Sequence, residues 1–287
     1  MRILITGASG LIGSALAAAL RAAGDDAIRL PRDWTAAALA GADAVVNLAG
    51  ASIGEGRWRP ARRRILVASR VDATARLARA IAALPQPPRV LVSASAVGYY
   101  GNRGEEELRE SAPSGQGFLP GLARAWEAAA LAAAPPEAEH LRVVLLRFGV
   151  VLAAGGGALP PLVRLFRLGL GGRLASGRQW MPWITLDDAV NVILAALRDP
   201  RYRGAVNAVA PQPVRNRDFT RSLAAALHRP AFCAVPAPLL RLALGRMADE
   251  LLLASLRVVP ARLAELGYAW RDPDLAPALA RLLASAS

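Results

Sequence analysis

Lysine is absent from this chain of 287 residues, and all 35 of its basic residues are arginines. Cysteine is nearly absent as well, since Cys233 stands alone and no disulfide can form within the chain. Such a composition fits a reducing compartment. The fold must therefore depend on its core, and the 54% of apolar residues lies well above a disordered composition.

Long apolar runs are also missing. No uninterrupted stretch reaches the roughly 18 residues that span a bilayer, because Arg147 breaks the segment 141–154. Arg2 before an apolar stretch resembles the start of a signal peptide, but a glycine-rich turn would then occupy the apolar core of that peptide. We therefore expect a cytoplasmic protein with no membrane partner.

The net charge of +13 raises the question of an acidic partner. A basic protein can bind nucleic acid by neutralising its phosphates. Here the arginines are spread along the chain and no recognition motif accompanies them, so we expect no nucleic-acid partner. One tight cluster, at positions 57, 59 and 62–64, has two interpretations: a solvated helix face or an anion-binding surface.

The first 150 residues alternate short apolar runs with alanine-rich helical runs. Runs of this length, joined by helical crossovers, predict a parallel sheet that is covered on both faces. This arrangement is the doubly wound α/β fold. The expected strands are Ile3–Thr6, Ala27–Leu30, Ala44–Leu48, Val90–Ala94 and Arg142–Arg147, and the expected helices are Leu11–Ala23, Ile65–Leu84 and Leu119–Ala134.

A glycine-rich turn, residues 6–13 (TGASGLIG), joins the first expected strand to the first expected helix. Gly7 permits a tight turn, Gly10 lets the backbone approach a pyrophosphate, and Gly13 lets the helix pack closely on the strand. The helix N-terminus adds free N–H groups and a partial positive charge. This context predicts a dinucleotide-binding Rossmann fold. A structural turn in a cofactor-free domain is the alternative.

The G-x-x-G-x-x-G spacing is similar to that of the short-chain dehydrogenase/reductase superfamily. Residues 47–50 (NLAG) resemble the N-A-G element of that superfamily, whose backbone passes the adenine side of the cofactor. An NAD site normally has Asp or Glu at the tip of the second strand, where this chain reads RLPRD over residues 29–33. Because a guanidinium matches a 2′-phosphate, we expect Arg32 to select NADP(H). Asp33 would serve an NAD ribose if the strand ran one residue longer.

Further segments resemble one branch of this superfamily, the atypical, extended members called epimerase family proteins, which are associated with sugar-nucleotide epimerases. The segments that carry the resemblance are 57–58 (RW), 69–74 (SRVDAT), 93–101 (SASAVGYYG), 126–127 (WE), 147–152 (RFGVVL), 169–172 (GLGG) and 177–184 (GRQWMPWI). Residues 235–237 (VPA) and 244–247 (LGRM) resemble the small domain of unknown function that this family carries. The resemblance implies a nicotinamide cofactor and leaves the substrate open. The expected cofactor contacts are Gly7, Ser9, Gly10, Leu11, Ile12, Gly13, Arg32, Asn47, Leu48, Ala49, Gly50, Arg70 and Val150.

The chain changes character after residue 150, where glycine and proline become frequent between residues 155 and 182. A strand is expected at Trp183–Leu186 and a helix at Asp187–Leu197, and prolines at 230, 236 and 238 indicate a linker. We predict a Rossmann domain over residues 1–235, with a substrate-side lobe mostly after residue 150, and a small helical C-terminal domain over 236–287. About 50 residues bury too little surface to be securely stable alone, so this last part should be a helical cap.

The proton relay of typical members is missing. In those members a tyrosine and a lysine lie one helical turn apart, and the lysine cation lowers the tyrosine pKa from about 10 toward neutrality. This chain has no lysine, and Leu122 and Trp126 stand at the matching spacing of the corresponding helix. The standard relay therefore cannot operate.

Four other groups are expected near the nicotinamide. Ser95 aligns with the catalytic serine of extended members, Tyr99 and Tyr100 follow the same strand, and Glu127 lies on the next helix. We predict that Tyr100, or failing that Tyr99, donates a proton, because a phenol is mostly protonated at pH 7. The alternatives are packing in the pocket wall for the tyrosines, a hydrogen bond at the strand end for Ser95, and a surface position or an arginine partner for Glu127.

Substrate contacts are expected from Arg178, Gln179 and Trp180, in a loop where extended members place substrate-facing groups. Arg178 could hold an anionic substrate, and Trp58, Trp180 and Trp183 could stack on a ring. Aromatic packing between the two lobes is the alternative. No spacing typical of metal ligands is present.

Two functions are compatible with these features. The first is an NADP-dependent oxidoreductase or epimerase acting on a small hydroxyl or carbonyl compound, with nucleotide-linked compounds among the candidates. The second is a non-catalytic NADP(H) binder that reports redox state to a partner. The retained serine, tyrosines and Arg–Gln–Trp loop favour the first, and the absent Tyr/Lys pair favours the second. The oligomeric state is left open.

Overall fold

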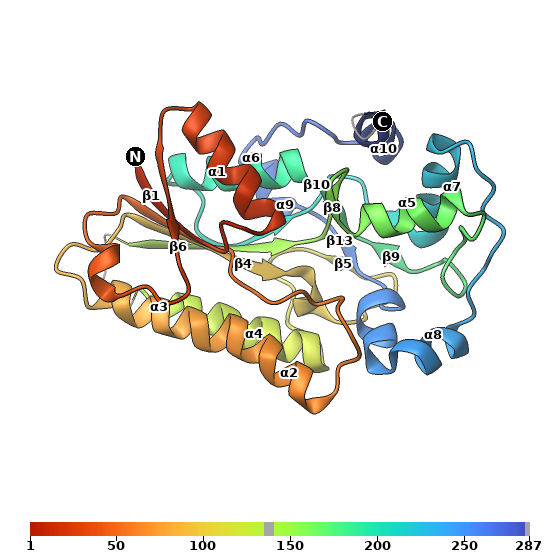
Figure 1. The fold of residues 1–287 in the computed structure, drawn as a ribbon, viewed down its shortest axis with the longest axis horizontal. Coiled ribbons are helices and arrows are strands. Elements are labelled where there is room, and N and C mark those ends of the chain that lie inside the picture. Colours follow the sequence, from red (N-terminus) through yellow and green to blue (C-terminus); the bar gives the residue numbers. More distant parts are fainter. Residues whose placement is uncertain (135–140, 285–287) are drawn as a thin grey trace.

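The computed structural model describes residues 1–134 and 141–284. A sheet of six parallel strands forms its centre (Figure 1). In spatial order the strands are β2 (Asp26–Leu30), β1 (Arg2–Thr6), β3 (Ala44–Asn47), β4 (Val90–Ala96), β6 (Arg142–Phe148) and β11 (Gly204–Ala208). The first five match predicted strands, whereas β11 was not predicted. Its sequence GAVNA holds a single β-branched residue, so it lacks the composition by which a strand is recognised.

Helices cover both faces of the sheet, as the doubly wound fold requires (Figure 1). Leu16 of α1 and Ile193 of α6 enter the apolar core of one face, and Ile81 of α3 and Ala130 of α4 enter that of the other. Within the described ranges, no helix has the length and apolarity needed to cross a membrane. The helices are α1 (Leu11–Ala22), α3 (Ala73–Ala82), α4 (Phe118–Leu131) and α6 (Leu186–Arg198).

The long helix predicted over Ile65–Leu84 begins earlier and is interrupted. Helix α2 (Pro60–Val67) starts at a proline, whose fixed φ suits the first helical turn. A single π turn (Ala68–Asp72) then joins α2 to α3. This turn carries Arg70, and it changes the direction in which side chains leave the helix axis at that point.

The order of the strands in the sheet indicates where a ligand would bind. From β1 the chain passes to β2 on one side, and then crosses to β3 on the other side of β1. The order of strands thus reverses between β1 and β3, whose last residues Thr6 and Asn47 lie opposite each other. In open α/β sheets, ligands bind outside the carboxyl ends of the strands at such a switch point.

A smaller lobe follows residue 149. Its helices pack around a separate apolar cluster that includes Phe166, Phe219 and Leu279. One small sheet contains β7 (Val150–Ala153), β8 (Gly156–Gly157) and β10 (Trp183–Thr185), and another pairs β9 (Trp180–Met181) with β12 (Val214–Arg215). The surrounding helices are α5 (Leu159–Arg167), α7 (Asn216–Ala226) and α10 (Leu275–Ala284).

The C-terminal region spreads over the rest of the molecule. It comprises α8 (Ala237–Leu244), a π turn (Ala248–Leu252), β13 (Arg257–Val258), α9 (Ala261–Glu265) and α10. Its one short strand, β13, pairs in parallel with β5 (Glu107–Leu108), so the region is not wholly helical as predicted. Met247, Val258, Leu263 and Leu279 each enter a different apolar cluster. The region therefore packs along its host rather than around a core of its own.

Candidate functional site

The glycine-rich turn lies against the turn that follows β3. A Cβ placed on Gly7 would come 2.7 Å from the carbonyl carbon and oxygen of Leu48, and Gly7 has a φ of +70°. A Cβ on Gly13 would lie 2.2 Å from the Gly7 oxygen. At Gly10 the nearest contact of such a Cβ is the Gly7 oxygen at 3.3 Å. The turn thus leaves no room for side chains at Gly7 and Gly13, and this bare cradle fits the pyrophosphate of a dinucleotide.

The buried side chain of Asn47, the last residue of β3, links three neighbouring elements by hydrogen bonds. Its side chain is 2% exposed, accepts from Thr6 Oγ1 at 2.7 Å, and donates to Thr74 Oγ1 at 2.8 Å and to Ser93 Oγ at 3.1 Å. With its amide groups occupied, the Asn47 side chain does not face a ligand. The Asn47 side chain instead fixes the turn whose later residues, Leu48–Gly50, border the crevice, and the backbone contact of Asn47 with a cofactor stays a prediction.

Arg32 lies beyond the tip of β2, where a 2′-phosphate contact was expected. The strand ends at Leu30, so it does not extend the extra residue that would bring Asp33 into the ribose position. Arg32 is exposed, and within the described residues its guanidinium makes no hydrogen bond or ion pair. Only its backbone oxygen is engaged, by Arg76 Nη1 at 3.2 Å. This arrangement favours Arg32 over Asp33.

Arg70 and Val150 border the crevice at different places. Arg70 Nη2 donates to the carbonyl oxygen of Ala51 at 2.8 Å, directly after the turn that follows β3. Val150 is half-buried and pairs with Trp183 in the small lobe. Both positions are compatible with the predicted contacts.

A buried ion pair lies at the carboxyl ends of β4 and β6. Ser95 and Arg147 are opposite each other in the sheet, and both reach Glu127 on α4. Ser95 Oγ donates to Glu127 Oε1 at 2.6 Å, while Arg147 Nε and Nη2 donate to the two carboxylate oxygens at 2.8 Å each. Exposed fractions are 3% for Ser95, 7% for Glu127 and 4% for Arg147.

The environment of Arg147 keeps it charged. Burial alone would lower the pKa of its guanidinium, but the hydrogen bonds to Glu127 and the proximity of Tyr100 raise that pKa above its ordinary value. A buried charge needs a partner of opposite charge or hydrogen bonds that satisfy it. An arginine partner was one of the alternatives that the sequence left open for Glu127, and the structure identifies that partner as Arg147.

Tyr100 is part of the same network and is fully buried, with an exposed fraction of 0%. Its hydroxyl donates to Asn207 Oδ1 at 2.7 Å and accepts from Arg147 Nη1 at 2.9 Å. Burial raises the pKa of Tyr100 to about 12, despite the opposing effect of Arg147. The structure therefore corrects the expectation for Tyr100, because its proton is committed to Asn207 and is shielded from any substrate.

Tyr99 is the better placed of the two tyrosines. It is half-buried, and the Arg147 guanidinium carbon lies 3.6 Å from the centre of its ring. Within residues 1–134 and 141–284 its hydroxyl has no hydrogen-bond partner, and that oxygen is not sealed from solvent. A phenol with a cation over its ring and a free hydroxyl can donate a proton outward.

The predicted substrate loop is only partly open. Arg178 is exposed, and its carbonyl oxygen accepts from Arg215 Nη1 at 2.7 Å. Gln179 is 8% exposed, and its Nε2 donates to the carbonyl oxygens of Leu174 and Leu252 at 3.2 Å each. Gln179 therefore links the loop to the C-terminal region, which corrects its expected role in binding substrate.

The tryptophans mostly serve packing. Trp58 is buried and lies edge-on to Phe118, with 5.3 Å between the ring centres, and Trp183 is 1% exposed. Stacking on a substrate ring is therefore excluded for both in this arrangement. Trp180 is half-buried, donates from Nε1 to Glu105 Oε2 at 2.8 Å, and has the Arg215 guanidinium 4.4 Å from its ring centre.

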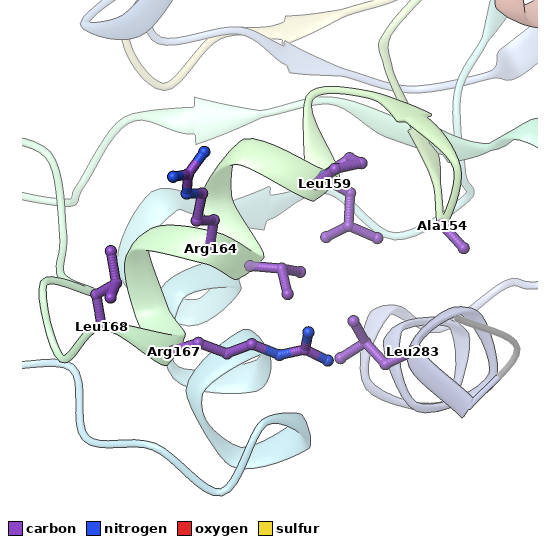
Figure 2. Close-up of a pocket in the computed structure, with 8 residues that line it drawn as sticks. Ala154, Leu159, Arg164, Arg167, Leu168 and Leu283 are labelled. Atoms are coloured by element: carbon purple, nitrogen blue, oxygen red, sulfur yellow. The ribbon is translucent and has the colours of Figure 1, made fainter. Parts of the chain in front are cut away.

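Two hollows lie beside the small lobe. A groove of about 470 Å³ borders the glycine turn and is lined by residues that include Leu11, Ser14 and Asp187. A second hollow of about 350 Å³ lies beside α5, where Arg167 extends toward Leu283 (Figure 2). The first hollow includes the predicted cofactor residue Leu11 in its lining, whereas the second contains none of the predicted site residues.

Among the contacts between the C-terminal region and the first half of the chain, two are made at helix ends, and neither was predicted. Glu250 Oε2 accepts the backbone N–H of Leu119 at 2.7 Å, in the first turn of α4. Arg57 Nε donates to the carbonyl oxygen of Ala243 at 2.8 Å, and its Nη2 donates to that of Leu242 at the end of α8. Part of the arginine cluster is thus a structural clamp.

Comparisons with known proteins agree with this architecture. Residues 3–208 match the model of the NAD dependent epimerase/dehydratase family, and residues 235–282 match a domain of unknown function (DUF1731). An epimerase family protein of Mycobacterium bovis is 40% identical over 293 residues, covering 96% of each chain. Human epimerase family protein SDR39U1 is 36% identical over 297 residues, covering 99% of this chain and 100% of the human one.

Solved structures point the same way. The structure of the human protein SDR39U1 (isoform 2) with NADPH has a TM-score of 0.91 and 36% identity, covering 98% of this chain and 99% of that one. The nucleoside-diphosphate sugar epimerase of Corynebacterium glutamicum has a TM-score of 0.81 and 35% identity, covering 98% of this chain and 57% of that one. MoeE5 in complex with UDP-glucose and NAD, at 21% identity and a TM-score of 0.78, shares the fold. This chain, with its Rossmann fold, belongs to the NAD dependent epimerase/dehydratase family.

Proposed function

We propose that this protein is an NADP(H)-dependent oxidoreductase or epimerase that acts on a small hydroxyl or carbonyl compound. The observation that carries the proposal is the bare cradle of Gly7 against Leu48, with the Ser95 hydroxyl near the carboxyl end of β4 in the same sheet and the Tyr99 hydroxyl in the turn that follows β4. The human relative crystallised with NADPH supports the choice of cofactor. The relative named a nucleoside-diphosphate sugar epimerase makes a nucleotide-linked substrate the first class to test.

The chain supplies binding and proton transfer in this scheme. Residues 6–13 and 48–50 would hold the dinucleotide, and Arg32 would bind its 2′-phosphate. When bound, NADPH supplies the hydride for carbonyl reduction. Tyr99 gives its phenolic proton to the carbonyl oxygen that receives charge, and solvent water reprotonates the phenolate. Arg147, 3.6 Å from the Tyr99 ring, stabilises the negative charge of that phenolate.

The cofactor preference can be tested by titration. NADP(H) should bind at least tenfold more tightly than NAD(H), and Arg32→Ala should remove that preference by weakening NADP(H) roughly ten- to hundredfold. Arg29→Ala, which removes an exposed arginine of β2, should change neither affinity by more than twofold. Equal affinities for the two cofactors in the wild type would contradict the proposal and favour Asp33.

A non-catalytic NADP(H) binder is the second candidate. The observation that favours it is the apolar character of α4: Leu122 and Trp126, at the spacing of the usual Tyr/Lys pair, are each 6% exposed. A screen of nucleotide sugars and small carbonyl compounds, followed by NADPH absorbance, separates the two candidates. Turnover that falls in Tyr99→Phe supports the enzyme, whereas cofactor binding without any turnover supports the second function.

A further inference from the structure

Exposed apolar side chains gather at the end of the molecule where α5 and α7 lie (Figure 1). They come from the end of α5, from the loop after it and from the linker that follows α7. Their exposed fractions run from 45% to 80%, and the residues are Leu165, Leu168, Leu170 and Phe232. We call these four residues the α5 patch. Large apolar side chains that are exposed together, rather than singly, indicate an interaction surface.

The loop after α5 and the linker after α7 are joined by their backbones. The N–H of Cys233 donates to the Gly171 oxygen at 3.1 Å. Phe232 and Leu170 directly precede these two residues, so they lie on neighbouring segments. A Cβ on Gly171 would come 2.6 Å from the ring of Phe166, which is 3% exposed. The glycine therefore lets the loop pack on the core, and the leucine before it remains exposed to solvent.

Arginines without counter-ions lie beside the α5 patch. Two of them, Arg164 and Arg167, line the same hollow as Leu168 (Figure 2). Within residues 1–134 and 141–284, four exposed guanidinium groups near the patch form no hydrogen bond or ion pair, those of Arg164, Arg167, Arg173 and Arg229. The reason is visible in the sequence, because residues 141–186 and 219–248 contain no aspartate or glutamate. The surface thus carries an uncompensated positive charge and is complementary to an anionic partner.

The composition of the two segments narrows the class of partner. In residues 159–175 and 229–235 every side chain except that of Cys233 is either apolar or a guanidinium. Protein–protein interfaces carry about ten direct hydrogen bonds, and these side chains include no oxygen to accept one. A second copy of the chain would bring like charges together. An anionic bilayer needs neither acceptors nor a matching shape, since its phosphates bind guanidinium groups and its acyl layer accepts leucine and phenylalanine.

We propose that the α5 patch docks on the surface of an anionic lipid bilayer. Its leucines and Phe232 would enter the boundary between headgroups and acyl chains, to a depth of about 5–10 Å. The four arginines would bind lipid phosphates at the level of the headgroups. This surface lies outside the cofactor crevice and does not depend on the proposed oxidoreductase function. It replaces the expectation of no membrane partner, which was drawn from the lack of spanning runs, because binding to a surface needs no spanning run.

Sedimentation with lipid vesicles tests the proposal on the full chain. At about 0.15 M salt, the wild type should sediment with vesicles of phosphatidylcholine and phosphatidylglycerol in equal parts, and not with phosphatidylcholine alone. Leu170→Ser/Phe232→Ser should weaken binding to the mixed vesicles by roughly tenfold or more, because two apolar side chains no longer enter the bilayer. Arg164→Gln/Arg167→Gln should weaken it by roughly fivefold or more. A wild type that does not sediment with the anionic vesicles overturns the proposal.

Matched controls separate the patch from the general attraction of a basic protein to anionic lipid. Ile65→Ser/Leu131→Ser removes two exposed apolar side chains from α2 and α4. Arg21→Gln/Arg64→Gln removes two exposed arginines and lowers the net charge as much as the patch variant does. Both controls should bind within about twofold of the wild type. Controls that lose as much binding as the patch variants would show non-specific attraction, which overturns the proposal.

Cys233 offers a second measurement that needs no substitution in the patch. It is the one cysteine of the chain, it is exposed, and it follows Phe232 directly. An environment-sensitive fluorophore on its Sγ should brighten and shift to shorter wavelength when anionic vesicles are added, and this measurement decides if a patch variant fails to fold. An unchanged spectrum at saturating lipid overturns the proposal. A dimer in analytical ultracentrifugation that Phe232→Ser dissociates would assign the patch to a second copy instead.

Discussion

Glu127 on α4 receives two hydrogen bonds from Arg147 on β6, one on each carboxylate oxygen, at 2.8 Å each. Both side chains are less than a tenth exposed, and among the ion pairs of residues 1–134 and 141–284 no other has this property. Such a two-point contact fixes the angle as well as the distance between helix and strand. It also leaves Ser95 with its proton directed at Glu127 and its lone pairs free.

Removing one partner of this pair should be costly. Glu127→Ala is expected to lower the free energy of unfolding by about 3–5 kcal/mol, because Arg147 would remain buried without a counter-ion. Glu265→Ala is the matched control, since Glu265 is 63% exposed in its ion pair with Arg262, and it should cost at most about 1 kcal/mol. Urea denaturation measures both. Equal losses for the two variants would contradict the importance given to burial, and the double variant Glu127→Leu/Arg147→Met should recover much of the stability.

The two neighbouring tyrosines should respond differently to loss of their hydroxyl groups. Tyr100→Phe is expected to lower the unfolding free energy by about 1–3 kcal/mol, because Arg147 and Asn207 each lose a buried partner. NADPH affinity should stay within twofold. Tyr99→Phe should leave stability nearly unchanged and lower turnover about 10²–10⁴-fold once a substrate is known. A Tyr100→Phe protein that is as stable as wild type, or that alone loses turnover, would reverse these assignments.

Stability should fall in alkaline solution, and Tyr100 should account for part of the fall, beside Tyr202 and Tyr268, whose pKa values burial also raises. The pKa of Tyr100 is about 12 in the folded protein, against about 10 in an unfolded chain. A raised folded pKa means that the contribution is fully present below pH 10 and is lost as the pH rises toward 12, by at most about 3 kcal/mol. Unfolding free energies measured across this range should decline less in Tyr100→Phe than in Tyr99→Phe. Parallel declines in the two variants would show that Tyr100 is not the group responsible.

Alanine substitutions at two glycines of the cofactor turn should have different effects, one on protein stability and the other on NADPH binding. Gly13→Ala should strongly destabilise the protein, since its Cβ would meet the Gly7 oxygen at 2.2 Å. Gly10→Ala has only a 3.3 Å contact to accommodate, so it should fold and yet bind NADPH at least tenfold more weakly. Gly121→Ala, with no atom within 4 Å, should stabilise α4 by about 0.5–1 kcal/mol. Thermal melts with and without NADPH test all three, and unchanged NADPH affinity in Gly10→Ala would argue against the cradle.

The C-terminal region should not fold alone. Expressed as residues 236–287, it is expected to give the circular dichroism of an unfolded peptide, because its buried side chains pack into four clusters that the rest of the chain completes. Residues 60–112, a segment of similar length, serve as the control for the behaviour of a fragment. A cooperative thermal transition from 236–287 would establish an independent domain instead.

The local parts of this architecture could be predicted from the sequence. The glycine turn, five strands and the helices around them are encoded in contiguous residues, where apolar runs and helix-stopping glycines and prolines coincide. The strand β11 was not predicted because Asn207 and Ala208 are buried in the sheet although neither residue type favours a strand. The limits of α2 and α3 escaped for a similar reason, since nothing in residues 68–72 distinguishes a π turn from an α turn.

The candidate site was harder to predict because its decisive contacts are distant in sequence. Arg147 looked like an interruption of an apolar segment, and only the fold brings it to Glu127. Tyr100 lost its predicted role to Asn207, which lies 107 residues further along the chain. Gln179 likewise does not face a substrate, because its side chain donates to the carbonyl oxygen of Leu252. The residues of a motif are candidates for contact with a ligand. Tertiary packing decides which of their side chains are exposed and which are buried.

The contacts of Arg57 and Glu250 make each half of the chain depend on a side chain that the other half supplies. Each half finishes a helix of the other, since Arg57 meets the last carbonyl groups of α8 and Glu250 meets the first turn of α4. If the C-terminal region were replaced by that of a relative, the new region would contribute Glu250 and the end of α8 but not Arg57 or the first turn of α4. Recombination between members of the family should therefore succeed only when both partners travel together, so that this segment is inherited with its host rather than traded as a module.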